Sequence, residues 1–221
     1  MVRMVGPGRR APAIAGLVIA TLVGACASAG PSPGQSRTPA SASPATADAA
    51  ARQYCTDQGG LLVDRQAVWN TNADPSAWLP LAGHQTFCEF QSGTGDQTTR
   101  ISVDLTTLSS EQPTLAAIAY LSKVPPTVPE HPGANPGSYN CNSGLAGAGT
   151  FGTSAAGGGW VAENEPVYTV MNECFFADGS AIDVFGLLYY ATGTVRGADL
   201  APLFRYQPHG KLPAVWDIPR R

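Results

Sequence analysis

The sequence predicts an α+β fold in which a mainly antiparallel sheet is assembled from two similar halves and has its helices on one face. Three observations predict this class. Residues 167–190 have the pattern of a β-hairpin, the same order of elements occurs earlier in the chain, and two cysteine pairs share one spacing. We therefore expect one folded domain, residues 48–221, whose halves (48–122 and 139–206) are each closed by a disulfide.

The segment before this domain has the pattern of a lipoprotein-type signal peptide, residues 1–25. A basic start precedes an apolar run that is too short to span a bilayer. The run ends in Leu22-Val23-Gly24-Ala25-Cys26, which resembles a bacterial lipobox. The resemblance implies export by the general route, acylation of Cys26 with palmitate-type chains, and anchoring to the outer face of the cell membrane. The alternative is an ordinary signal peptide with a chance cysteine.

Charge limits the possible partners of the exported part. Three of the 13 basic residues lie in the signal, which leaves 10 against 16 acidic residues and a net charge of −6. The remaining basic residues are scattered. We therefore expect no nucleic-acid partner and no electrostatic docking onto anionic lipids, so that the acyl anchor alone would hold the protein at the membrane.

Residues 26–47 are rich in Ser, Pro and Ala and contain no large apolar side chain. Such a segment cannot bury enough surface to offset its chain entropy, so a disordered tether is expected. Residues 30–34 match G-x-S-x-G. A nucleophile elbow needs a strand before this motif and a helix after it, and the tether can supply neither.

The first half of the domain combines helix and strand signals. Gly59-Gly60 is a helix stop, Pro125-Pro126 is another, and Ile101, Val103 and Leu105 alternate with polar residues as in a half-buried strand. The expected elements are a helix (48–58), a strand (61–69), a hairpin (84–91 and 98–106) and a helix that follows Ser109-Ser110-Glu111 and ends at Ser122. The proline-rich residues 123–138 connect the halves.

The second half is organised around the hairpin in residues 167–190. Asp178-Gly179 predicts a type I′ turn, which needs positive φ at both central residues; glycine adopts this freely and Asp tolerates it. Alternate positions around the turn are apolar: Tyr168, Val170, Cys174, Phe176, Ile182, Val184 and Leu188. One face of the ribbon is therefore apolar. A short helix, residues 195–204, is expected to follow.

The two halves share an order of elements. Cys55 precedes Cys88 by 33 residues, and Cys141 precedes Cys174 by the same number. Each second cysteine is followed by x-Phe, a turn, and a strand with Ile-x-Val (Ile101/Val103 and Ile182/Val184). Four cysteines in an exported chain imply two disulfides with three possible connectivities, and the repeat favours Cys55–Cys88 with Cys141–Cys174. Without a C-x-x-C pair, we expect no metal site and no cofactor.

Short motifs resemble a known family. Tyr54-Cys55-x-x-x-Gly59-Gly60 and Cys174-x-Phe176-x-Asp178-Gly179-Ser180 are similar to the two ends of a cysteine-rich domain of exported bacterial proteins, named after haemolysins and of unknown function. The resemblance implies a small exported disulfide domain and no active site. The signal, lipobox and composition also resemble the uncharacterised lipoproteins of actinobacteria.

Several segments contain residues that could take part in catalysis or binding. His84 begins a strand and could act with Glu89 or Asp74 in a hydrolase. An acidic stretch contains Glu163, Glu165, Glu173, Asp178 and Asp183. Paired carboxylates can cleave glycosides, but such a run is more often a solvated strand face, and we expect the latter. Residues 147–152 match G-x-G-x-x-G without the helix that a dinucleotide site needs, so residues 144–159 are interpreted as a flap.

Aromatic residues give the remaining functional signal. Trp69, Trp78, Trp160 and Tyr190 lie near expected strand ends and could rim a concave ligand surface, although any one of them could instead fill the core. We therefore expect a lipid-anchored, extracytoplasmic, non-enzymatic protein that binds a small ligand or a cell-envelope partner. The alternative is an envelope hydrolase that uses His84.

Overall fold

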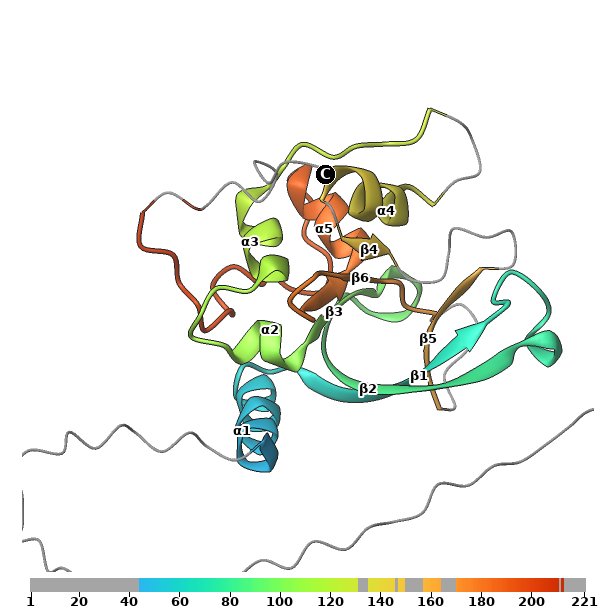
Figure 1. Cartoon of the computed structure of the whole chain (residues 1–221), viewed down its shortest axis with the longest axis horizontal. Coiled ribbons are helices and arrows are strands. Elements are labelled where there is room, and N and C mark those ends of the chain that lie inside the picture. The colour runs from blue at the N-terminus through green and yellow to red at the C-terminus, as the bar shows by residue number, and fades with distance from the viewer. Residues whose placement is uncertain are drawn as a thin grey trace, which may run out of the picture. The chain divides into compact units, whose positions relative to one another are not determined.

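The structure, a computed structural model, describes residues 44–130, 135–145, 147–149, 157–163, 170–210 and 212. It confirms the α+β class: helices accompany one antiparallel sheet with strand order β4-β6-β7-β3-β2-β1-β5 (Figure 1). The strands are β1 (Leu61–Trp69), β2 (Leu79–Ser92), β3 (Thr99–Asp104), β4 (Ala148–Gly149), β5 (Gly158–Ala162), β6 (Glu173–Phe175) and β7 (Ala181–Asp183). The signal, Cys26 and most of the predicted tether and flap lie outside these residues.

The helical elements lie before, between and after the strands. They are α1 (Pro44–Asp57), α2 (Leu105–Ser109), α3 (Leu115–Ser122), α4 (Pro136–Tyr139) and α5 (Val184–Ala191), with short turns η1 (Pro75–Ala77), η2 (Gly95–Gln97) and η3 (Asn140–Gly144). Helix α1 begins inside the range predicted as tether. Within the described ranges, no helix combines the length and apolar character needed to cross a membrane.

The sheet curls back on itself. Strand β5 pairs with β1 at one end of the strand order, and its Trp160 also exchanges two backbone hydrogen bonds with Met171, at 2.8 and 2.9 Å. Met171 lies just before β6, near the other end of the order. The curl gives the sheet a concave face that solvent reaches poorly and a convex face that packs on helices.

The convex face carries a row of four paired residues. Cys88 pairs with Val103, Val103 with Ile182, and Ile182 with Cys174. All four are buried, and they share one hydrophobic core with residues of α1, α2, α3 and α5. Because side chains alternate along a strand, the neighbours Glu89, Ser102, Glu173 and Asp183 lie on the concave face.

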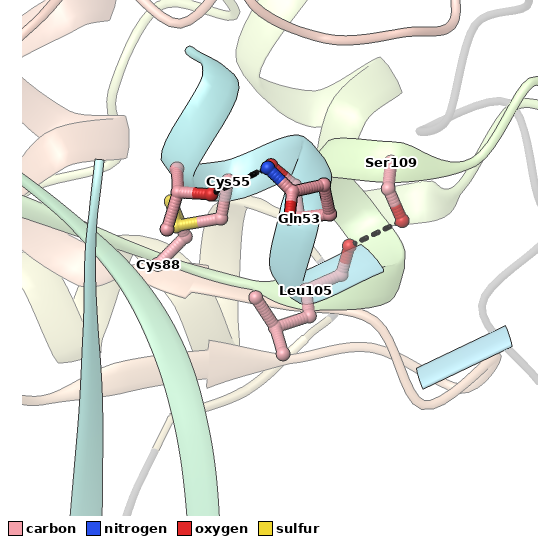
Figure 2. Close-up of a disulfide and its surroundings, with 6 residues drawn as sticks. Gln53, Cys55, Cys88, Leu105 and Ser109 are labelled. Carbon is pink, nitrogen blue, oxygen red and sulfur yellow. Dashed lines mark hydrogen bonds between the residues drawn. A yellow bond between two sulfur atoms is a disulfide. The ribbon is translucent and has the colours of Figure 1, made fainter. Parts of the chain in front are cut away.

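Both predicted disulfides are present. The Cα atoms are 5.8 Å apart in Cys55–Cys88 and 5.7 Å apart in Cys141–Cys174. Figure 2 shows the first, which ties the end of α1 to β2. A glycine touches each bridge: Gly60 N–H donates to the Cys55 carbonyl and Gly147 N–H to the Cys141 carbonyl, and a Cβ on either glycine would overlap a sulfur.

Three local predictions in the second half are wrong. The turn is not type I′, because only Gly179 has positive φ, and the loop instead closes through Phe176 N–H to the Ser180 carbonyl, at 2.9 Å. The second arm is a strand only to Asp183, whose carboxylate accepts from Phe185 N–H and Gly186 N–H and starts α5. Residues 195–204, predicted as a helix, form turns.

Candidate ligand pocket

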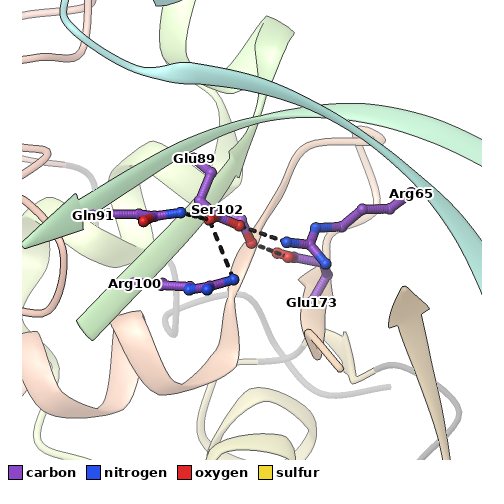
Figure 3. A network of polar contacts seen from close by, with 6 residues as sticks. All are labelled: Arg65, Glu89, Gln91, Arg100, Ser102 and Glu173. Atoms are coloured by element: carbon purple, nitrogen blue, oxygen red, sulfur yellow. Dashed lines mark hydrogen bonds and ion pairs between the residues drawn. The ribbon is translucent and has the colours of Figure 1, made fainter. Parts of the chain in front are cut away.

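The concave face holds a buried polar network contributed by four strands (Figure 3). Arg65 on β1, Glu89 on β2, Ser102 on β3 and Glu173 on β6 are all 0% exposed. Arg65 Nη2 donates to Glu89 Oε2 at 2.5 Å, and Ser102 Oγ donates to Glu173 Oε1. A buried charge is stable only when it is paired or neutralised, so these contacts hold the inside of the curl together.

Glu89 is the centre of this network. Besides Arg65, it accepts from Gln91 Nε2 at 2.7 Å and lies 3.7 Å from Arg100 Nη1. Two guanidinium groups therefore face one carboxylate, and the closer, fully buried Arg65 makes the shorter contact. Arg100 is 26% exposed and extends toward the outside of the network.

Glu173 and Asp183 form a pair of acids that face each other across β6 and β7. Burial and the neighbouring Asp183 charge raise the pKa of Glu173 well above its ordinary value. Burial raises the pKa of Asp183 to about 6, against the opposing effect of its two backbone hydrogen bonds and of Arg196. Like charges directly opposite each other destabilise a sheet, so each acid disfavours ionisation of the other.

A pocket of about 530 Å³ opens beside these acids. Such a volume suits a small molecule. Its lining includes two partly exposed arginines, the buried Asp183 and the exposed Asp96. The lining residues are Gly95, Asp96, Thr98, Arg100, Val170, Met171, Asn172, Asp183, Phe185 and Arg196.

Arg196 is the most distinctive residue of this lining. Its guanidinium lies 5.4 Å from the ring centroid of Tyr189 and 5.9 Å from that of Phe185, two residues of α5. Arg196 Nε is shielded from solvent and has no hydrogen-bond partner in the part of the chain that the structure describes. Aromatic faces attract cations, so the side chain is held in place while it keeps hydrogen-bonding capacity.

The four aromatics predicted to rim a ligand surface do not line this pocket. Trp160 is 7% exposed and packs edge-on against Phe87 at 5.5 Å. Tyr190 is 6% exposed and stacks on Tyr120 at 3.9 Å. These two residues are core residues, which corrects the prediction. Trp69 and Trp78 lie at the tip of the β1–β2 hairpin, where Trp78 Nε1 donates to the Ala73 carbonyl at 3.0 Å.

Among the described residues, the structure pairs His84 with no carboxylate. His84 is exposed on β2, opposite Gln66, and its side chain makes no hydrogen bond or ion pair with the described residues. Glu89 points into the buried network. Asp74 instead accepts from Ser76 N–H at 2.9 Å and caps η1.

The acidic stretch is not a solvated strand face. Glu173 and Asp183 are buried, and Asp178 accepts from Leu115 N–H at the start of α3. Glu163 is exposed, and Glu165 lies outside the described residues. The paired acids therefore lie inside the curled sheet, because the alternate positions of β6 and β7 that carry them face the concave side.

Sequence reasoning missed Arg65, Arg100 and Arg196, and it considered Glu89 only as a partner of His84. A weak signal was present. Arg65 falls on the same parity as Val63 and Ala67, and Glu89 falls on that of Phe87, so both charges occupy inward positions of apolar strands. No pattern in the sequence connects Arg196, which follows α5 in a turn, with this face.

Comparison with known proteins found no matching family model, no matching curated protein and no matching solved structure. The resemblance to the haemolysin-named domain therefore stays a prediction, and function must be argued from the pocket itself.

Proposed function

We propose that the protein is an extracytoplasmic binding protein, held on the outer face of the cell membrane by acylated Cys26, that takes a small polar ligand into the pocket beside Asp183. The observation that carries the proposal is the pocket lining, which combines two arginines with a buried acid and a volume of about 530 Å³. A concavity of this size into which a few polar groups point is typical of ligand sites.

The rigidity of the walls supports binding. The pocket adjoins a network in which Arg65 and Glu89 are fully buried and paired, and α5 is fixed to β7 by the Asp183 cap. Three lining residues, Arg100 on β3, Asp183 on β7 and Phe185 on α5, lie on strands and a capped helix, which lose little entropy when a ligand binds.

The lipobox at residues 22–26 and the composition of the residues that follow it support the acyl anchor. Two or more acyl chains hold a protein at a membrane almost permanently. The pocket would then sample the space next to the membrane.

We also propose that the domain arose from a duplicated unit. Two correspondences between the halves support this. In the structure, Ile182 corresponds to Val103, two residues after the Ile101 that the sequence pattern matches with it. Val103 and Ile182 each pair with the second cysteine of a bridge, and each precedes an Asp that caps a helix. Gly60 and Gly147 each contact the bridge of their own half.

The binding proposal is tested by extracting the mature protein from its own membranes and recording its mass under native conditions. We expect a mass larger than that of the acylated chain by one small molecule, which is released when the protein is denatured. A native mass equal to that of the acylated chain alone would count against a small-ligand function, and a protein bound in its place would favour the envelope-partner prediction.

A further inference from the structure

We infer that the ligand carries an oxyanion group, a carboxylate or a phosphate, and that Arg196 and Arg100 bind this group in the pocket. The inference rests on the proposed binding function and specifies the chemistry of its ligand.

Arg196 supplies the first reason. Its guanidinium is held over Phe185 and Tyr189, lines the pocket, and has a buried Nε without a hydrogen-bond partner among the described residues. A buried donor left unsatisfied destabilises the protein, and an oxyanion removes that penalty by accepting from Nε and a terminal nitrogen together. The planar fork of Arg matches carboxylate and phosphate oxygens better than any neutral acceptor.

Arg100 supplies the second reason. The carboxylate that it faces, Glu89, already accepts from Arg65 at 2.5 Å and from Gln91 at 2.7 Å, while Arg100 Nη1 lies 3.7 Å away. Arg100 is also 26% exposed and lines the pocket, where it adds a second positive charge to that of Arg196. Arg100 and Arg196 come from β3 and from the turn after α5, so they approach the cavity from separate elements.

The acids of the pocket limit the ligand. Asp183 and the exposed Asp96 also line it. They oppose the approach of large polyanions, because repulsion grows with ligand charge. A ligand with one or two negative charges and a small volume therefore fits the lining best.

The test uses the full mature chain in detergent at pH 6, observed through the Nε–H signals of its arginines by NMR. Sodium acetate and inorganic phosphate are titrated separately, with sodium chloride at equal ionic strength as the control. We expect a saturable shift of the Arg196 signal with at least one of the two anions. Saturation by acetate alone assigns a carboxylate, and saturation by phosphate alone assigns a phosphate.

Variants test whether Arg196 binds the anion. We expect Arg196→Gln to weaken binding of the effective anion roughly 10-fold or more, as loss of a charge-assisted hydrogen bond implies. The signal followed in that variant is Arg100 Nε–H. Arg205→Gln is the matched control, because Arg205 also stacks on an aromatic ring, 4.4 Å from that of Tyr54, but does not line the pocket.

Two results would overturn the inference: shifts that match those caused by chloride, or equal affinity in Arg196→Gln and the unaltered chain. If the natively extracted protein nevertheless holds a neutral or cationic molecule, the binding function stands and only the ligand class is wrong. If neither anions nor any co-purified molecule bind, both proposals fall.

Discussion

Arg65 is a fully buried arginine that forms an ion pair with Glu89, which is equally buried. An isolated charge inside a protein is very unfavourable, whereas a paired one is tolerated. The pair therefore works as a unit: removal of either residue takes from the other its shortest charged contact. The second guanidinium, Arg100, gives Glu89 partial compensation and makes it the less vulnerable member.

Removing one member should reveal this dependence. We expect Arg65→Met to lower the free energy of unfolding by about 3 kcal/mol or more, since it strands the Glu89 carboxylate in the core. The measurement is urea unfolding at pH 7. Arg52→Met is the matched control, because Arg52 pairs with Asp48 on the surface and should change stability by less than about 1 kcal/mol. Equal, small effects for both would contradict the buried-pair account.

Asp183 makes stability depend on pH. Its pKa rises from an ordinary 3.8 to about 6 in the folded protein, so the folded state binds a proton that the unfolded state releases. The stabilisation is therefore complete below pH 4 and is lost as pH rises to about 6, by on the order of 2–3 kcal/mol. Glu173, whose pKa is also raised, acts in the same direction.

We expect urea unfolding to show greater stability at pH 4.5 than at pH 7.5. Asp183→Asn should reduce this difference, because Asn still caps α5 but cannot ionise. Asp74→Asn is a suitable control, since Asp74 is an exposed cap whose pKa is lowered by its hydrogen bonds with Ser76. A pH difference that is unchanged in Asp183→Asn would show that the buried acid is not its source.

At the scale of elements, each disulfide is packed against a glycine. The φ of Gly60 is not positive, so its backbone conformation does not require glycine. Glycine is needed because a Cβ there would overlap the sulfur of Cys88. The bridge and the chain reversal after α1 therefore occupy one crowded site. The same arrangement recurs with Gly147 at the second bridge.

Gly60→Ala should accordingly destabilise the fold. We expect a loss of about 1–3 kcal/mol, the usual effect of overpacking, measured as a lower Tm with both bridges intact. Gly83→Ala on β2 is the control, because its Cβ would lie 3.4 Å from Ala67 Cβ, and its effect should stay within about 0.5 kcal/mol. If Gly60→Ala is as stable as the control, the packing account is wrong.

The elements also show what the sequence could predict. Strand β1, the end of α3 and both bridges follow from alternation, the Pro125-Pro126 stop and cysteine spacing, whereas the N-cap of α3 is Thr114 and not the predicted Ser109-Ser110. Helix α5 could not be predicted from the sequence, because residues 184–191 are apolar on nearly every side. Such a run fits a strand or a buried helix equally well. The deciding contact is local, the Asp183 carboxylate on two backbone N–H groups.

The pocket was harder to predict than the fold. It depends on the curl, in which β5 pairs with β1, a strand far from it in the chain, and also bridges to Met171. Burial of Glu173 follows from the same curl, because an open sheet would leave its concave face in water. Aromatic residues near strand ends suggested a ligand surface, yet Trp160 fills the inside of the curl instead.

At the scale of the whole molecule, the anchor proposal makes a separate prediction. Cys26→Ser should move the protein from the detergent phase to the aqueous phase and abolish labelling by radioactive palmitate. Ser28→Ala, just past the lipobox, is the control and should partition like the unaltered protein. Unchanged partition of Cys26→Ser would mean that something other than acylation holds the protein at the membrane.

A crystal structure of the protein purified from its own membrane, without added ligand, tests the binding account most directly. We predict electron density for a small molecule in the pocket, with an oxygen within hydrogen-bond distance of Arg196 Nε. A pocket that holds only water, with the Arg196 guanidinium turned away from Phe185 and Tyr189, would contradict it.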